Sequence, residues 1–178
     1  MGQAEQADQS VATTIFRQNT WATQKLLDFC EGLTAEQLAA TAPGTYGTIQ
    51  DILVHLVGAE VGYAHRVNGR WPDTPDLREG FPGFAALHEA ARWAGEELLQ
   101  LALTTRTETL VVERWPEENQ VEEYPLAALL MQAINHSTEH RTQASTIITQ
   151  IGLEPPDMTG WEYMVATGAY RQRAADEA

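Results

Sequence analysis

Apolar side chains recur every three or four residues over four long segments of this chain, which is the spacing of one face of an α-helix. This pattern predicts helices over residues 11–31, 48–67, 83–103 and 125–151. Ser10 is a suitable cap for the first helix, and Gly32 follows its last turn. Pro125 is suited to the first position of the fourth helix, which Gly152 follows.

The segments between the predicted helices differ in character. Residues 34–39 have capping-box spacing and predict a short turn of helix, whereas 70–82 hold three prolines and predict a long connection. Residues 107–124 are rich in Val, Thr, Glu and Tyr around a Pro-Glu-Glu-Asn turn, which predicts a small β-hairpin. The prediction for the fold is therefore an all-α protein, a four-helix bundle with a β-hairpin insert between the third and fourth helices.

The whole chain, 1–178, is expected to form a single domain with frayed ends at about 1–9 and 171–178. After the fourth helix, Pro155 and Pro156 forbid a continuation of that helix. The aromatic and apolar side chains that follow are expected to pack back on the body; they are Trp161, Tyr163 and Met164.

Composition and charge narrow the classes of function. The chain has 178 residues, of which 43% are hydrophobic, enough for one substantial core. It holds 11 Lys and Arg against 25 Asp and Glu, so its formal net charge is −14 and its surface repels nucleic acids and anionic membranes. No stretch approaches the roughly 20 apolar residues of a membrane span, and the first ten residues lack a signal-peptide pattern. We therefore expect a cytoplasmic protein without nucleic-acid or membrane partners.

The fourth predicted helix carries the most informative side chains. His136 and His140 are one turn apart and fall within its apolar stripe, so both imidazoles are expected to point into the bundle. Burying imidazoles costs free energy unless their nitrogens are hydrogen-bonded or ligate a metal. The spacing suits a shared metal ion. It also suits a purely structural pair, hydrogen-bonded to the flanking Gln132 and Gln143.

A third histidine would complete a metal site. His55 flanks the apolar side of the second predicted helix and is the best candidate. His65 is roughly 15 Å further along that helix, so it cannot share a site with His55. His88 lies beside the apolar stripe of the third helix, where it is either a reserve ligand or a hydrogen-bonded core residue.

Other site chemistries find less support in the sequence. The run His136-Ser-Thr-Glu139-His140 matches the inverted zinc-protease pattern, in which Glu139 would be the general base and Glu154 or Glu162 the third ligand. Helical geometry, however, turns Glu139 away from both imidazoles. The Glu-x-x-His pairs of di-iron bundles are missing from the sequence, and the single cysteine, Cys30, is expected to be a small core residue.

Several motifs together resemble one family, the DinB-like (damage-inducible) metal-binding bundles. The fourth helix carries N-H-x-x-x-H-R-x-Q over 135–143, followed by I-G-L-E-P-P over 151–156. The pattern F-R-x-N-x-W over 16–21 resembles the family's first helix, and I-x-D-I-L-V-H-L-V-G-A-E over 49–60 resembles its second. The resemblance covers nearly the whole chain.

This resemblance implies an up-down-down-up helix order, a homodimer, and a three-histidine site for Zn²⁺, Ni²⁺ or a similar divalent ion. The ligands that it implies here are His55, His136 and His140. Asn135 and Gln143 are candidates to orient the ligand imidazoles. Because the family includes S-transferases, we expect a metal-dependent enzyme that joins a small thiol to an electrophilic small molecule, or a small hydrolase. The alternative is a non-catalytic metal- or ligand-binding bundle with a role in stress response.

Overall fold

The computed structural model describes residues 10–106 and 108–173, and over these it is mostly helical with one small antiparallel sheet. The elements in chain order are α1 (Val11–Glu31), α2 (Ala35–Leu38), α3 (Ile49–Asn68), a 3₁₀ turn η1 (Leu77–Glu79), α4 (Phe84–Thr104), β1 (Leu110–Trp115), β2 (Gln120–Pro125), α5 (Leu126–Gln150) and α6 (Gly160–Ala166). Of the predicted frayed ends, residues 1–9 and 174–178 lie outside the described residues, as does Thr107 of the predicted insert.

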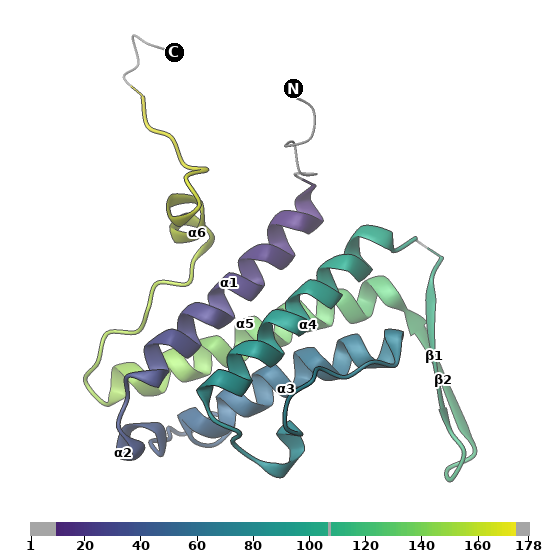
Figure 1. Cartoon of the computed structure of the whole chain (residues 1–178), viewed down its shortest axis with the longest axis horizontal. Coiled ribbons are helices and arrows are strands. Elements are labelled where there is room, and N and C mark those ends of the chain that lie inside the picture. The colour runs from purple at the N-terminus through teal and green to yellow at the C-terminus, as the bar shows by residue number, and fades with distance from the viewer. Residues whose placement is uncertain (1–9, 107, 174–178) are drawn as a thin grey trace.

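The four long helices pack side by side, with α1 against α4 and with α3 against both α4 and α5 (Figure 1). Their bounds agree with the sequence prediction to within about one residue at each end. The assignment of Pro125 is corrected, because its ψ of 133° is extended, so it ends β2 and α5 begins at Leu126. None of the helices among the described residues is long and apolar enough to cross a membrane.

Local capping interactions explain where the helices begin and end. The side chain of Ser10 accepts a hydrogen bond from the backbone N–H of Thr13 at the start of α1. Thr48 and Asp51 form a reciprocal capping box at the start of α3. Gly69 ends α3 in the left-handed conformation, with φ of 69°, which glycine adopts without steric cost.

Two apolar clusters fill the space between the helices. The larger one joins α1, α3, α4 and the C-terminal half of α5, and includes Cys30, which is fully buried as predicted. The smaller one lies around Leu98, Leu126 and Ala133. A Cβ on Gly95 would overlap the side chain of Thr20, so glycine allows the close approach of α1 and α4.

The predicted β-hairpin is confirmed. The strands pair antiparallel from Leu110 opposite Pro125 to Trp115 opposite Gln120, and Figure 1 shows them projecting beyond the helix ends. Val111 is buried in the smaller apolar cluster, whereas most other hairpin side chains are exposed. The hairpin is therefore attached to the helices mainly at one end.

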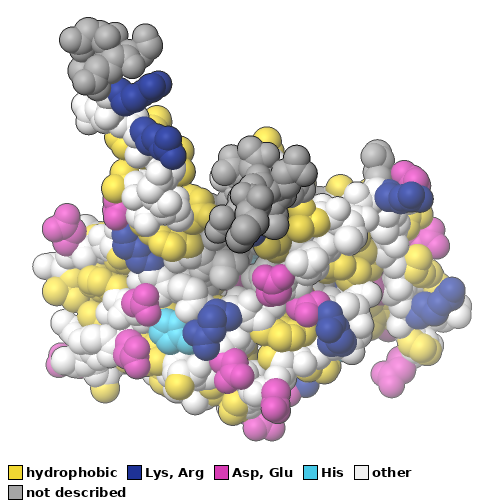
Figure 2. Space-filling view, turned by 45° about the horizontal axis from the view of Figure 1, so that its top comes forward, with side chains coloured by type: hydrophobic (Ala, Val, Ile, Leu, Met, Phe, Trp, Pro, Cys, Tyr) yellow, Lys and Arg dark blue, Asp and Glu magenta, His cyan; other side chains and the backbone are white. Residues whose placement is uncertain are grey.

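The C-terminal segment contains α6, a short helix that the sequence pattern did not predict. Tyr163 packs its ring against Trp21 at 5.5 Å, and Glu162 pairs with Lys25 at 3.1 Å. Packing of the tail on the body is thus observed at Tyr163. The prediction is wrong for Trp161, whose side chain is 69% exposed. Figure 2 shows Lys and Arg side chains scattered among Asp and Glu over the visible face of the molecule.

Candidate metal centre

Three histidines from two helices converge on one point. His55 comes from α3, whereas His136 and His140 come from successive turns of α5. One ligand atom from each ring lies within 4.8 Å of the other two, and the Nε2 atoms of His55 and His136 are 3.1 Å apart. The ring centroids are separated by 4.3 to 4.9 Å. The two helices thus bring together the three histidines that the sequence singled out.

The donor chemistry of this cluster fits a divalent ion. Zinc–nitrogen bonds of about 2.0–2.1 Å at tetrahedral angles separate two ligand nitrogens by about 3.3 Å, close to the spacing of His55 and His136. Burial, reinforced by the neighbouring imidazoles, lowers the pKa of His136 to about 4. Burial and His140 also lower the pKa of His55. Both rings are therefore unprotonated near neutral pH, as metal ligands must be.

Gln143 fixes the orientation of one imidazole. Its Oε1 atom accepts a hydrogen bond from the backbone N–H of Tyr46 at 3.1 Å. The same oxygen lies 3.1 Å from Nδ1 of His140, so Nδ1 must be the protonated donor. The Nε2 lone pair of His140 is then free to bind a cation, which is how protein ligand shells usually set the tautomer of a metal-binding histidine.

Two tyrosines form walls around the imidazoles. The ring of Tyr46 stacks on His55 with centroids 3.9 Å apart and meets His140 edge-on at 5.5 Å. Tyr63 meets His136 edge-on at 5.8 Å. Sequence reasoning missed both tyrosines, because Tyr46 lies in a loop without periodicity and Tyr63 reads as an ordinary apolar position of α3.

A purely structural histidine pair was the other interpretation of the sequence. Nδ1 of His136 is buried and has no hydrogen-bond partner among the described residues. A structural role leaves this nitrogen without a partner, and so does ligation of an ion through Nε2, so the atom does not separate the two roles. Of the two glutamines suggested as partners, Gln143 contacts His140, whereas Gln132 is exposed.

The other predicted site residues lie elsewhere. Asn135 and Glu139 are exposed on α5, and no hydrogen bond joins either of them to the three imidazoles within the described part of the chain. The Nδ1 atom of His88, the reserve ligand, lies 2.6 Å from Oε1 of Gln24, and His88 does not belong to the cluster. His65 stacks on Trp71 at 3.8 Å, also apart from the cluster.

The inverted zinc-protease arrangement is not formed. Glu162, one of its two possible third ligands, pairs with Lys25 on α1. The other, Glu154, is exposed in the segment after α5. In the described residues the third member of the cluster is His55 instead.

A second buried polar cluster lies beside the histidines and was not predicted. Glu60 on α3 is 1% exposed, and its Oε1 accepts hydrogen bonds from Asn19 at 2.7 Å and Ser137 at 2.6 Å. Arg141 donates to Oδ1 of Asn19 at 2.8 Å and to Thr23 at 3.0 Å. Burial raises the pKa of Glu60, against the lowering effect of Ser137 and Arg141. The available signal was the helical register, which places these polar residues among core positions.

Comparisons with known proteins agree with this architecture. The sequence model of the DinB family matches residues 1–175. The crystal structure of a DinB-like protein from Bacillus cereus ATCC 10987 is similar, with a TM-score of 0.56 and 23% sequence identity over 80% of this chain and 91% of that chain. At this identity the likeness concerns the fold alone. No curated protein matches the chain. Because the family match spans nearly all of the sequence, the chain belongs to the DinB family.

Proposed function

We propose that this protein is a metal-dependent enzyme whose Zn²⁺ or Ni²⁺ ion is held by His55, His136 and His140. The observation that carries the proposal is the convergence of three imidazole nitrogens within 4.8 Å of one another. Three neutral nitrogen ligands leave at least one coordination position for a substrate, which is typical of catalytic rather than structural zinc sites.

The reaction that we propose is the transfer of a small thiol to an electrophilic small molecule, or the hydrolysis of a small substrate. A divalent ion supplies Lewis acidity and lowers the pKa of a thiol or water that binds to it. Gln143 holds the His140 ring with Nε2 directed away from its own amide oxygen. Tyr46 stacks on the His55 ring and Tyr63 packs against the His136 ring, which restricts the rotation of both imidazoles. Glu139 is exposed and receives no role in this proposal.

The architecture enters the proposal as well. We interpret the four long helices as an up-down-down-up bundle forming one domain over 1–178. We also propose that the chain forms a homodimer, because its family resemblance implies one. Light scattering on the purified protein tests the dimer.

An activity screen tests the proposed reaction. Protein loaded with Zn²⁺ or Ni²⁺ is incubated with glutathione, cysteine or N-acetylcysteine and the electrophile 1-chloro-2,4-dinitrobenzene. Hydrolysis of 4-nitrophenyl acetate is followed in parallel. We expect turnover that is lost in His55→Ala and kept in His88→Ala, since His88 lies outside the cluster. Metal binding without turnover of any of these substrates would instead favour the alternative, a non-catalytic metal-binding bundle.

A further inference from the structure

A cleft of about 1050 Å³ opens beside the three histidines. It lies between the outward face of α3 and the connection 70–83, which Figure 1 shows running beside this helix. His55 and Tyr46 belong both to the cleft wall and to the histidine cluster. The α3 residues that line it extend from Gln50 to Gly62, a length of about 18 Å along the helix. The volume is at the upper end of the range for small-molecule sites.

Small residues on α3 create this space. Gly58, Ala59 and Gly62 form part of the floor, where larger side chains would fill the cleft. A Cβ on Gly62 would meet no atom within 4 Å. Glycine within a helix costs about 1 kcal/mol relative to alanine. Close packing therefore does not explain why glycine occupies position 62 of this helix.

The opposite wall, formed by the connection 70–83, is largely apolar, and its first residues are held by contacts to α3 and α4. Trp71, Leu77 and Phe81 belong to this wall together with Pro72 and Pro75. Trp71 stacks on His65, which lies on α3.

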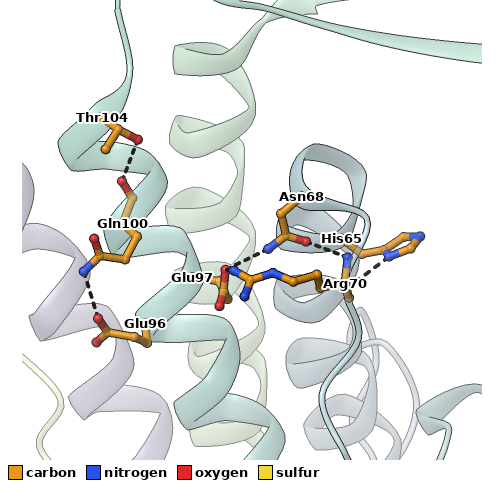
Figure 3. A network of polar contacts seen from close by, with 7 residues as sticks. All are labelled: His65, Asn68, Arg70, Glu96, Glu97, Gln100 and Thr104. Atoms are coloured by element: carbon orange, nitrogen blue, oxygen red, sulfur yellow. Dashed lines mark hydrogen bonds and ion pairs between the residues drawn. The ribbon is translucent and has the colours of Figure 1, made fainter.

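Figure 3 shows how the residues before Trp71 are held. Asn68 donates to Glu97 of α4 at 2.8 Å and accepts from the backbone N–H of Arg70 at 2.8 Å. The Arg70 side chain also pairs with Glu97. The start of the connection is thereby fixed to α3 and α4, so the cleft is formed in advance of any ligand.

The charges in the cleft disfavour an anionic ligand. Among the residues that line the cleft, Arg78 is the single lysine or arginine. Its guanidinium donates two hydrogen bonds to the carboxylate of Asp76, from Nε at 2.9 Å and from Nη2 at 2.6 Å. Arg78 lowers the pKa of Asp76 to about 2, so that carboxylate stays charged. Asp51 adds a second carboxylate to the lining. Thr74 offers a buried hydroxyl without a hydrogen-bond partner among the described residues.

We propose that this cleft binds an uncharged, flat and largely apolar small molecule, such as an aromatic electrophile, and presents it to the metal site at His55. The assignment as a substrate site rests on the proposed function. The binding of such a molecule does not rest on the proposed function. Of the three proposed metal ligands only His55 lines the cleft, and the other lining residues take no part in the proposed metal binding.

A matched pair of glycine substitutions tests the cleft. Nile red, an uncharged aromatic dye, is titrated into metal-free protein and followed by fluorescence. We expect saturable binding at one dye per chain, weakened at least tenfold in Gly62→Leu and unchanged in Gly160→Leu. Gly160 begins α6 outside the cleft, and a Cβ there also meets nothing within 4 Å. Circular dichroism checks that both variants fold, and Trp71→Ala, at a half-exposed position, replaces Gly62→Leu if that variant does not.

Equal dye binding in wild type and the cleft variant would overturn the proposal. So would tighter binding of the anionic dye 8-anilinonaphthalene-1-sulfonate at the same site. If metal-free protein binds Nile red as expected but the metal-loaded protein turns over nothing, the cleft stands and the proposed function fails. If turnover occurs and Gly62→Leu leaves its KM unchanged, the proposed function stands and the cleft assignment fails.

Discussion

Two clusters of buried or half-buried polar side chains lie side by side along α5, and they differ in the groups that they bring together. In the cluster of Glu60, Asn19, Ser137 and Arg141, donors meet acceptors at Oε1 of Glu60 and Oδ1 of Asn19, whereas Oε2 of Glu60 has no partner among the described residues. The positive charge of Arg141 lowers the pKa of the Glu60 carboxyl against the effect of burial. In the histidine cluster, three ring nitrogens approach one another, and Nδ1 of His136 has no partner among the described residues.

The difference separates a stabilising role from a binding role. A buried charge that loses its partner is strongly unfavourable, so the Glu60 cluster should hold α1, α3 and α5 together. Converging lone pairs offer the fold little by themselves, but they suit a divalent cation. Burial and the neighbouring imidazoles lower the pKa of His136 and so disfavour a proton there. On the proposed function, neighbouring positions of α5, His136 and Ser137, serve two different purposes.

The largest expected effect is on stability, from Arg141→Leu. Leaving Glu60 buried without its cation should lower the free energy of unfolding by about 3–5 kcal/mol in urea denaturation at pH 8. The exposed Arg92→Leu is the control and should change it by less than about 0.5 kcal/mol.

The same variant has a defined pH dependence. Without Arg141, the pKa of folded Glu60 rises further above its unfolded value, so folding takes up a proton. The destabilisation should therefore shrink as the pH falls from 8 toward 5. A loss that is small and independent of pH would remove the contrast between the two clusters.

The next effect is the response of stability to metal. Zn²⁺ at about 100 times its Kd should raise the free energy of unfolding by about 2.7 kcal/mol in the wild type. His136→Ala should lose this increment, whereas Arg141→Leu should keep it, provided the variant still folds. An equal increment in wild type and His136→Ala would mean that the ion binds somewhere else.

A smaller effect is expected from the residue that orients His140. Gln143→Ala removes the acceptor of the Nδ1 proton and should weaken Zn²⁺ binding about 10–100-fold in calorimetric titrations. Asn135→Ala, at an exposed position of the same helix, should leave the Kd unchanged. Equal losses in both variants would contradict the role given to Gln143.

A further effect concerns acid and the metal-free protein. The pKa of His136 is about 4 in the folded chain, below the value of about 6.5 in an unfolded chain. The unfolded state therefore binds more protons between these values, and stability should fall as the pH is lowered from about 6.5 to 4. His136→Ala should flatten this slope. An unchanged slope would show that other groups cause it.

Much of this molecule follows from local sequence signals. The long helices repeat their apolar positions over five or more turns and carry caps such as Ser10 and Gly69, so their bounds could be predicted. His136 and His140 lie one turn apart on one helix, which fixes their mutual geometry before any tertiary contact is known. His55 could be selected as the third candidate ligand from its position beside the apolar face of a second helix.

The parts that escaped prediction depend on contacts between distant segments. Tyr46 reaches the histidines through a loop, and the cleft depends on the path of the connection 70–83. The seven residues of α6 are too few to show a helical period. Glu60 and Arg141 resemble surface residues when considered singly, because their partners come from other helices.

Metal titration of the histidine variants tests the central claim most directly. Metal-free wild type is titrated with Zn²⁺ in a calorimeter beside His55→Ala, His136→Ala, His140→Ala and the control His88→Ala. We predict one ion per chain in wild type and His88→Ala, and loss of that binding event in each of the other three. Retention of one ion per chain, with unchanged affinity, in both His55→Ala and His136→Ala would contradict it.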